Sequence, residues 1–170
     1  YTTLDVVRAA ATSARSDEIT LYTGNDDSIV IDLLTKFKFQ KNGKTYTKCF
    51  DGGLLGHWTM WTQNVVNMFQ SIRSEREKDA ISPEFLTLAA QVTDANGVFF
   101  DAKNGFAGCI PGVHEVLRRQ GLMENIYCLN PNEVLSEGQS EEIDRIMESY
   151  PHLTDDDFIN NHIDEWKKRV

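Results

Sequence analysis

The chain has 170 residues, of which 41% are hydrophobic and 25% are charged, a composition typical of a folded globular protein. Its formal net charge of -9 disfavours nucleic acid and anionic membrane surfaces as partners, because only the short basic segment 36–48 opposes it. Three widely spaced cysteines without a CxxC pair indicate neither a disulfide framework nor a zinc site, and no apolar run reaches transmembrane length, so we expect a cytoplasmic protein without metal or cofactor.

The first element is predicted to be a helix that begins at Thr2 or Thr3, either of which can cap it. Leu4, Val7, Ala10 and Ala11 recur at helical spacing before the polar run 13–17 ends the pattern. Because the chain enters this helix without an initiator methionine, we expect it to be a piece of a longer protein.

A strand, a turn and a helix follow within residues 18–34. The β-branched run 19–23 ends at Gly24, and an amphipathic helix pattern begins immediately after Asp26 and Asp27. Ligands bind at the turn that follows the carboxyl end of a strand in α/β sheets. Gly24 permits close approach of a ligand, and the two aspartates suit either helix capping or substrate contact.

The next segment, 36–49, alternates strictly around Asn-Gly, which predicts a β-hairpin inserted into the fold. Residues 51–58 then read as a short buried strand flanked by glycines. Side chains alternate along a strand, so Leu55 and His57 are expected to share one face.

The remaining residues are predicted to be helical, without further strands. Helical spacing, caps and stops indicate helices over 61–72, 83–98, 113–119, 139–147 and from 154 onward. Two parallel strands need further neighbours and covering helices to bury both faces. The pattern therefore indicates the carboxyl-terminal half of a larger βα repeat, 1–80, followed by a helical extension, 81–170.

Four segments, in the same order, resemble the dihydrodipicolinate synthase and N-acetylneuraminate lyase family of class I aldolases. The sequence Leu-Tyr-Thr-Gly-Asn-Asp-Asp at 21–27 is similar to the family's turn after its seventh strand, and 52–57 resembles its eighth strand. Residues 104–122 resemble its asparagine–proline turn and following helix, and 130–147 resemble its closing segment. The resemblance implies an α/β fold, the part of a TIM (β/α)8 barrel that contains strands 7 and 8, with a helical carboxyl-terminal extension.

The resemblance also implies a lyase or synthase that forms a lysine Schiff base with pyruvate or a related 2-oxo acid and releases or accepts an aldehyde. The family's lysine ends the sixth strand, which aligns upstream of this chain. The lysines present here lie in polar or helix-end contexts that would not lower an amine pKa, so this chain alone is predicted to be inactive. The expected partners are the remaining amino-terminal part of the barrel and other copies in a homo-oligomer, a tetramer in this family.

The residues that the resemblance assigns to substrate binding are Gly24, Asp26, Asp27, Leu55, His57 and Asn104. His57 departs from the small residue usual at its position, and a structural histidine that bonds a carbonyl remains the alternative reading. Asn104 matches only loosely, because the residues after it lengthen the bend.

Two other functions remain open from the sequence. The helices after residue 82 and the acidic composition would also suit a helical protein-interaction module without catalytic activity. A metal-dependent aldolase could use Asp26, Asp27 and His57 as oxygen and imidazole ligands. A lysine-bearing strand immediately upstream would favour the Schiff-base enzyme over both.

Overall fold

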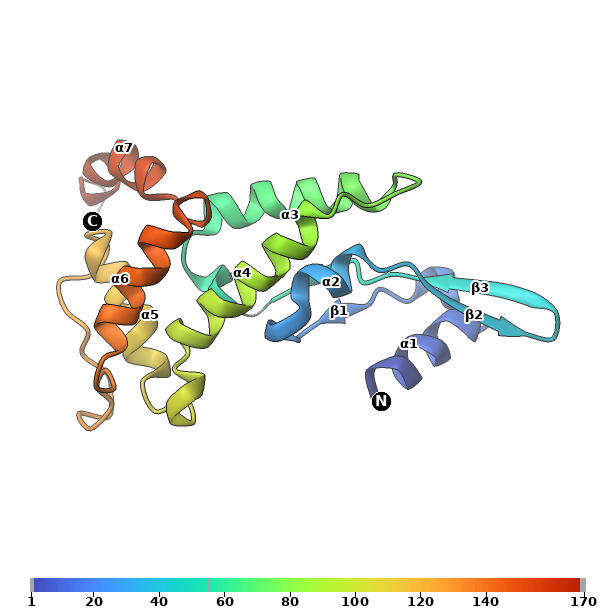
Figure 1. Cartoon of the computed structure of the whole chain (residues 1–170), viewed down its shortest axis with the longest axis horizontal. Coiled ribbons are helices and arrows are strands. Elements are labelled where there is room, and N and C mark those ends of the chain that lie inside the picture. Colours follow the sequence, from blue (N-terminus) through green and yellow to red (C-terminus); the bar gives the residue numbers. More distant parts are fainter. Residues whose placement is uncertain (1, 55, 169–170) are drawn as a thin grey trace. The chain divides into compact units, whose positions relative to one another are not determined.

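A computed structural model describes residues 2–54 and 56–168 (Figure 1). The chain forms two compact units: unit 1 comprises Tyr1–Leu55 and Gln70–Ala89, and unit 2 comprises Gly56–Phe69 and Ala90–Val170. Two helices, α3 (Thr62–Arg76) and α4 (Glu84–Phe99), contribute residues to both units. The sequence-based boundary between residues 80 and 81 stays a prediction. No helix within the described ranges is long and apolar enough to cross a membrane.

The first stretch of unit 1 contains two α-helices, a β-hairpin and a small parallel sheet of two strands. Its elements are α1 (Thr2–Thr12), η1 (Ser16–Glu18), β1 (Tyr22–Thr23), η2 (Asp26–Ser28), α2 (Ile29–Leu34), β2 (Phe37–Lys41), β3 (Lys44–Lys48) and β4 (Gly52–Gly53). Strands β1 and β4 run parallel, with Tyr22 opposite Gly52. The helical spacing of apolar residues in α1 and α2 forms one buried face on each helix. The buried residues on these faces are Val7, Ala10, Ala11, Ile29, Val30 and Leu33.

The predicted hairpin is confirmed as the antiparallel pair β2 and β3. Asn42 and Gly43 form its two-residue loop with φ of 52° and 74°, the left-handed geometry of a type I′ turn that favours this dipeptide. The hairpin lies beside α1 (Figure 1) and packs onto unit 1, where the ring of Phe37 meets that of Phe50 edge-on at 5.7 Å. Lys48 also donates to the carbonyl of Ser16 at 2.7 Å.

The predicted strand over 51–58 is wrong beyond its first residues, because only Gly52–Gly53 is extended and paired. His57 lies instead in the short helix η3 (Gly56–Thr59) of unit 2. Gly56 has φ of 71°, and the His57 amide donates to Asn96 Oδ1 at 2.8 Å, which fixes a turn. The strand alternation expected to place Leu55 and His57 on one face therefore does not apply, and Leu55 lies outside the described residues.

Unit 2 consists of helices in the part that the structure describes. They are η3, the first half of α3, the second half of α4, η4 (Ala102–Asn104), α5 (Cys109–Arg119), α6 (Gln139–Ser149), η5 (Pro151–Leu153) and α7 (Asp156–Lys167). Their core contains Trp61, Phe99, Val116, Ile143 and Ile146, each at most 1% exposed. Ile143 and Ile146 are apolar positions that recur at helical spacing in the sequence, whereas Trp61 lies just before α3 with φ of 52° and Phe99 lies one residue beyond the predicted helix 83–98.

Two glycines bring α5 close to its neighbours. A β-carbon at Gly112 would lie 2.2 Å from the carbonyl oxygen of Phe99, and one at Gly108 would lie 2.0 Å from Gln139 Oε1. Both distances are far below van der Waals contact, so a β-carbon at Gly112 would clash with backbone, and one at Gly108 would have to displace the Gln139 side chain. Gln139 uses the space to donate its amide to the carbonyl of Gly108 at 3.0 Å.

The expectation of TIM-barrel strands 7 and 8 is wrong. The structure is 59% helical, and the four short strands of the described ranges form two separate two-stranded sheets. A barrel strand must pair on both edges to close the sheet, whereas β1 and β4 pair only with each other in these ranges. The apolar run 19–23 contributes only Tyr22–Thr23 to a strand, because the amide of Leu21 bonds the side chain of Asp51.

Candidate functional site

A cavity of about 340 Å³ opens in unit 1 where the turn after β1 faces the first turns of α1. Its wall is formed by three short segments that meet there. The lining residues are Thr2, Thr3, Val6 and Val7 of α1, Tyr22, Thr23, Gly24 and Asn25 of β1 and its turn, and Phe50. The site therefore lies at the turn where the sequence predicted ligand binding.

Thr23 builds the turn. Its side chain is buried, and its Oγ1 donates to Asp32 Oδ2 at 2.7 Å while accepting the amide of Asn25 at 3.2 Å. Asp32 belongs to α2, so the end of β1 is tied to the following helix. Gly24 and Asn25 are left exposed at the cavity wall.

The second strand is held against the first by backbone bonds that continue past the ladder. The Asp51 amide donates to the Leu21 carbonyl at 2.8 Å, and the Leu54 amide donates to the Thr23 carbonyl at 3.3 Å. A β-carbon at Gly53 would lie 3.0 Å from the side chains of Thr23 and Ile29. The glycine thus allows β4 to approach closely, and the carboxyl ends of both strands meet at the same edge.

The lining combines an apolar wall with a few polar groups. Val6, Val7 and Phe50 supply the apolar wall, and the hydroxyls of Thr2 and Thr3 stand in the first turn of α1. Within the described ranges, the lining offers hydroxyl, amide and apolar groups, which can bind a ligand through hydrogen bonds and apolar contact.

The predicted site residues of the turn lie in or beside this cavity. Gly24 lines it, whereas Asp26 and Asp27 start η2 next to it. Burial, and then the neighbouring charge of Asp27, raise the pKa of the half-buried Asp26 carboxyl. Asp27 is exposed.

The other described site residues, His57 and Asn104, belong to unit 2. The His57 side chain is 1% exposed, with Nδ1 3.1 Å from Asn96 Oδ1, and burial lowers its pKa to about 4. Asn104 is exposed, and its amide donates to Asp101 Oδ1 at 2.7 Å. Leu55 lies outside the described residues.

Sequence reasoning missed several lining residues. Thr23 and Asn25 carry a local signal, because a threonine followed by Gly-Asn before a helix is typical of a side-chain-bonded turn. Thr2 and Thr3 were interpreted only as helix caps. Phe50 carries no local signal, because it reaches the cavity through the hairpin that precedes it.

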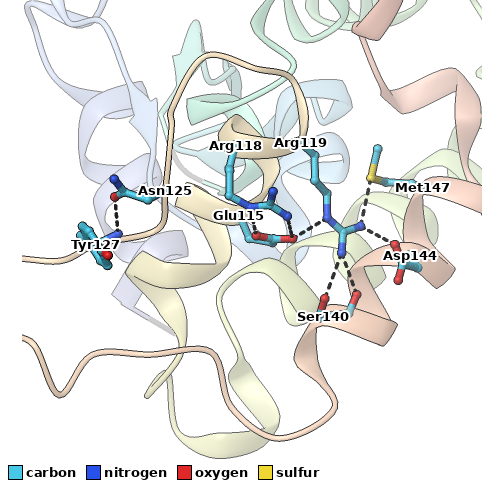
Figure 2. A network of polar contacts seen from close by, with 8 residues as sticks. All are labelled: Glu115, Arg118, Arg119, Asn125, Tyr127, Ser140, Asp144 and Met147. Atoms are coloured by element: carbon cyan, nitrogen blue, oxygen red, sulfur yellow. Dashed lines mark hydrogen bonds and ion pairs between the residues drawn. The ribbon is translucent and has the colours of Figure 1, made fainter.

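A polar network in unit 2 joins α5 to α6 (Figure 2). The buried carboxylate of Glu115 accepts from the guanidinium groups of Arg118 and Arg119 at 2.8 Å, and Arg118 holds the pKa of that carboxyl below its usual value of 4.5. Arg119 also donates to Asp144 and Ser140 of α6. All the charges in this network are compensated, so its role is structural.

One cysteine of unit 2 lies beside a histidine. The distance from Cys128 Sγ to His114 Nδ1 is 3.8 Å. Burial, with a smaller contribution from Glu133, raises the pKa of the Cys128 thiol, which keeps it protonated and weakly nucleophilic. The pair therefore lacks the lowered thiol pKa of a catalytic dyad.

Across residues 2–54 and 56–168, no group of three or more histidine, cysteine or carboxylate side chains is arranged to hold a metal ion. No family model, curated protein or solved structure matches the chain. The resemblance of its motifs to the aldolase family therefore stays a prediction.

Proposed function

We propose that this chain is the carboxyl-terminal portion of a lyase or synthase that acts on pyruvate or a related 2-oxo acid through a lysine Schiff base. The observation that carries the proposal is the cavity at the turn 21–27, one of the four segments that resemble the aldolase family. In the proposed enzyme this cavity holds part of the substrate.

The chemistry of the lining supports a small anionic substrate. The hydroxyls of Thr2 and Thr3 can donate hydrogen bonds to a carboxylate. The apolar wall formed by Val6 and Phe50 suits the methyl end of a 2-oxo acid. A cavity of about 340 Å³ also leaves room for the aldehyde that such an enzyme releases or accepts.

The proposal requires a nucleophilic lysine from outside residues 1–170. The apolar surface beside the cavity supports an additional stretch of polypeptide there, because Val6, Tyr22 and Leu54 are 54%, 58% and 63% exposed. Exposed apolar side chains gathered around a pocket are typical of a surface that further protein covers.

Borohydride reduction in the presence of pyruvate tests the proposal. The longer protein that contains this chain should form a trapped adduct, and mass spectrometry should place it on a lysine upstream of Tyr1. Residues 1–170 alone should give no adduct. An adduct on a lysine of this chain, or none on the longer protein, would contradict the proposal.

Amide chemical shifts test the cavity itself. In a pyruvate titration of residues 1–170, the amides of Gly24 and Asn25 should shift, because both line the cavity. The amide of Gly43, in the exposed hairpin turn, serves as the control and should not move. Shifts confined to unit 2 would remove the cavity from the proposed substrate site.

A helical interaction module is the second candidate, and one segment favours it. The extended residues 122–134 expose Tyr127, Leu129 and Val134, which gathers apolar surface on one stretch of unit 2. This function predicts a concentration-dependent assembly that sedimentation would detect. Replacing Tyr127 and Leu129 together by serine should abolish that assembly, and a sedimentation profile unchanged by the double variant would exclude this segment as the contact.

A further inference from the structure

The hairpin of unit 1 has an open edge along β2. In an antiparallel pair, alternate residues turn their amide and carbonyl groups away from the partner strand. Counting from the two-residue turn, Lys38 and Gln40 are the residues of β2 that do so. In the described part of the chain, no backbone hydrogen bond from another element reaches either residue. Their backbone groups can therefore accept a further strand.

A cavity of about 450 Å³ runs along this edge. Arg8 and Thr12 of α1 form one wall, and the other is formed by β2 from Lys38 to Lys41. Figure 1 shows α1 beside the hairpin, and the guanidinium carbon of Arg8 lies 5.4 Å from the centre of the Phe39 ring. The edge is thus bordered by a helix that can contact an occupant's side chains.

The charge at this edge is opposite to that of the rest of the molecule. Five of the 17 basic residues are lysines of segment 36–48, which contains no acidic residue. The rest of the chain therefore has 12 basic and 26 acidic residues. Lys38 and Lys41 are exposed, and neither forms an ion pair with any side chain that the structure describes. The guanidinium of Arg8 is already paired with Asp5 at 3.0 Å.

A second copy of the chain does not fit this edge. Pairing two β2 strands would bring Lys38 and Lys41 of both copies onto one sheet without any acidic residue. Like charges on neighbouring strands are destabilising, and edge lysines are a common means of preventing self-pairing. The same lysines favour an occupant of opposite charge.

We propose that β2 binds an extended peptide rich in aspartate and glutamate, which adds as a third strand to the hairpin. Backbone bonds to Lys38 and Gln40 would hold the peptide in register, and alternate side chains would face the two sides of the sheet. Carboxylates on one side would meet Lys38, and those on the other would meet Lys41. The proposal uses no residue of the β1 cavity and is independent of the Schiff-base function.

Fluorescence anisotropy tests the charge requirement with a labelled peptide of about eight residues, long enough to span β2, in which pairs of adjacent glutamates are separated by single valines, so that carboxylates face both sides of the strand. We expect the double variant K38Q/K41Q to weaken binding about tenfold, since each lost charge pair at a partly exposed site costs up to about 1 kcal/mol. The matched control K44Q, on β3 and outside the cavity, should change binding by less than about twofold. A peptide with lysine in place of glutamate should not bind. Equal binding of both peptides would overturn the proposal.

Proline substitution tests the strand edge separately from charge. Gln40→Pro removes an amide that points away from β3, so it should block the peptide while the hairpin persists. Thr45→Pro is the matched control. Thr45 lies opposite Gln40 and points its amide to the other edge of the hairpin. Either substitution also removes the same side-chain hydrogen bond, from Gln40 Nε2 to Thr45 Oγ1 at 2.8 Å. Far-ultraviolet circular dichroism verifies folding of both.

Loss of binding in Gln40→Pro with retention in Thr45→Pro supports the third strand. Equal affinity in the two proline variants would overturn it, because a peptide held by charge alone is indifferent to the edge. Self-association of the unmodified chain that Gln40→Pro abolishes would also overturn it, since β2 would then pair with a second copy.

Discussion

The two units use their polar groups and apolar side chains differently. Unit 2 joins its helices through buried side-chain bonds: the amide of Gln139 donates to the Gly108 carbonyl, and that of Gln120 donates to Asp155 at 2.9 Å. Within the described residues, Gln120 Oε1 and the indole nitrogens of Trp58 and Trp61 are buried without a hydrogen-bond partner. Unit 1 leaves Tyr22 and Leu54 exposed beside its parallel strands and keeps the outer edge of β2 open. Buried, satisfied networks make a packing arrangement unique, whereas open edges and exposed apolar surface are available for binding. We therefore assign a stabilising core to unit 2, and to unit 1 the open strand edge and the cavity that we propose to bind ligands.

The largest effect is expected from emptying the core of unit 2. Phe99 is fully buried and packs edge-on against Trp61 at 5.0 Å between ring centres. Phe99→Ala should lower the free energy of unfolding by about 3–5 kcal/mol. Urea unfolding followed by tryptophan fluorescence measures it, because Trp58, Trp61 and Trp166 all belong to unit 2.

Phe106→Ala is the control for that experiment, because Phe106 is 62% exposed and should contribute no more than about 0.5 kcal/mol. If both alanine variants had the same stability, the assignment of the stabilising core to unit 2 would be wrong.

A somewhat smaller effect is expected from acidification through His57. Burial lowers its folded pKa from 6.5 to about 4, so the unfolded chain binds this proton more readily. The contribution of His57 to the free energy of unfolding is therefore fully present above pH 6.5 and decreases as the pH drops from 6.5 to 4. Below pH 4 it is constant, and the total loss is about 3 kcal/mol. Unfolding free energies at pH 7 and pH 5 should differ less in His57→Gln than in the unmodified chain. An imidazole that titrates near pH 6.5 by NMR would contradict this.

The Glu115 network should give an intermediate effect. Glu115→Gln keeps the size of the side chain but removes the charge that Arg118 and Arg119 approach. We expect a loss of about 2 kcal/mol at pH 7, because both guanidinium groups lose a charged acceptor. The folded pKa of Glu115 is lowered, so its stabilisation is present above its ordinary pKa of 4.5 and disappears as the pH falls through the folded value.

Calorimetry across this acidic range measures that dependence, and Glu142→Gln, on the exposed face of α6, is a control that should change stability far less. A Glu115→Gln protein as stable as the unmodified chain at pH 7 would show that Arg118 and Arg119 gain nothing from the carboxylate.

The smallest effect is expected in unit 1, at the hairpin turn. Gly43 has φ of 74° and open space around its α-carbon, so Gly43→Ala introduces backbone strain without a clash. The expected cost is about 1 kcal/mol. Hydrogen exchange of the β2 and β3 amides should accelerate, while tryptophan fluorescence of unit 2 remains unchanged. A shift in the fluorescence transition would show that the hairpin and unit 2 unfold together.

Local signals in the sequence predicted the elements that local geometry determines. Asn42-Gly43 identified the hairpin, and the spacing of Val7, Ala10 and Ala11 identified α1, because the turn and the helix face each depend on neighbouring residues only. The turn at Gly24 was likewise found at the cavity wall. These predictions needed no knowledge of distant contacts.

The errors have long-range causes. The run to His57 reads as a strand, but its conformation depends on Asn96, which lies 39 residues further along the chain. The barrel prediction assumed that strands near Tyr22 and Gly53 would extend and find further neighbours, and the residues described here supply none. Phe50 was not predicted as a lining residue for a similar reason, because its position at the cavity depends on how the hairpin packs against it through Phe37.

The close approach at Gly108 and Gly112 has a consequence for how this sequence can vary. The two positions are four residues apart, Gly108 at the N-cap and Gly112 in the first turn of α5, and at both of them backbone and polar atoms occupy the place of a side chain. A library that randomises residues 104–114 and is sorted for folded protein should return glycine at both positions and a broad choice at the exposed Ala107 and Ile110. At Gly108 and Gly112, substitution is thus limited because there is no space for even one additional carbon atom.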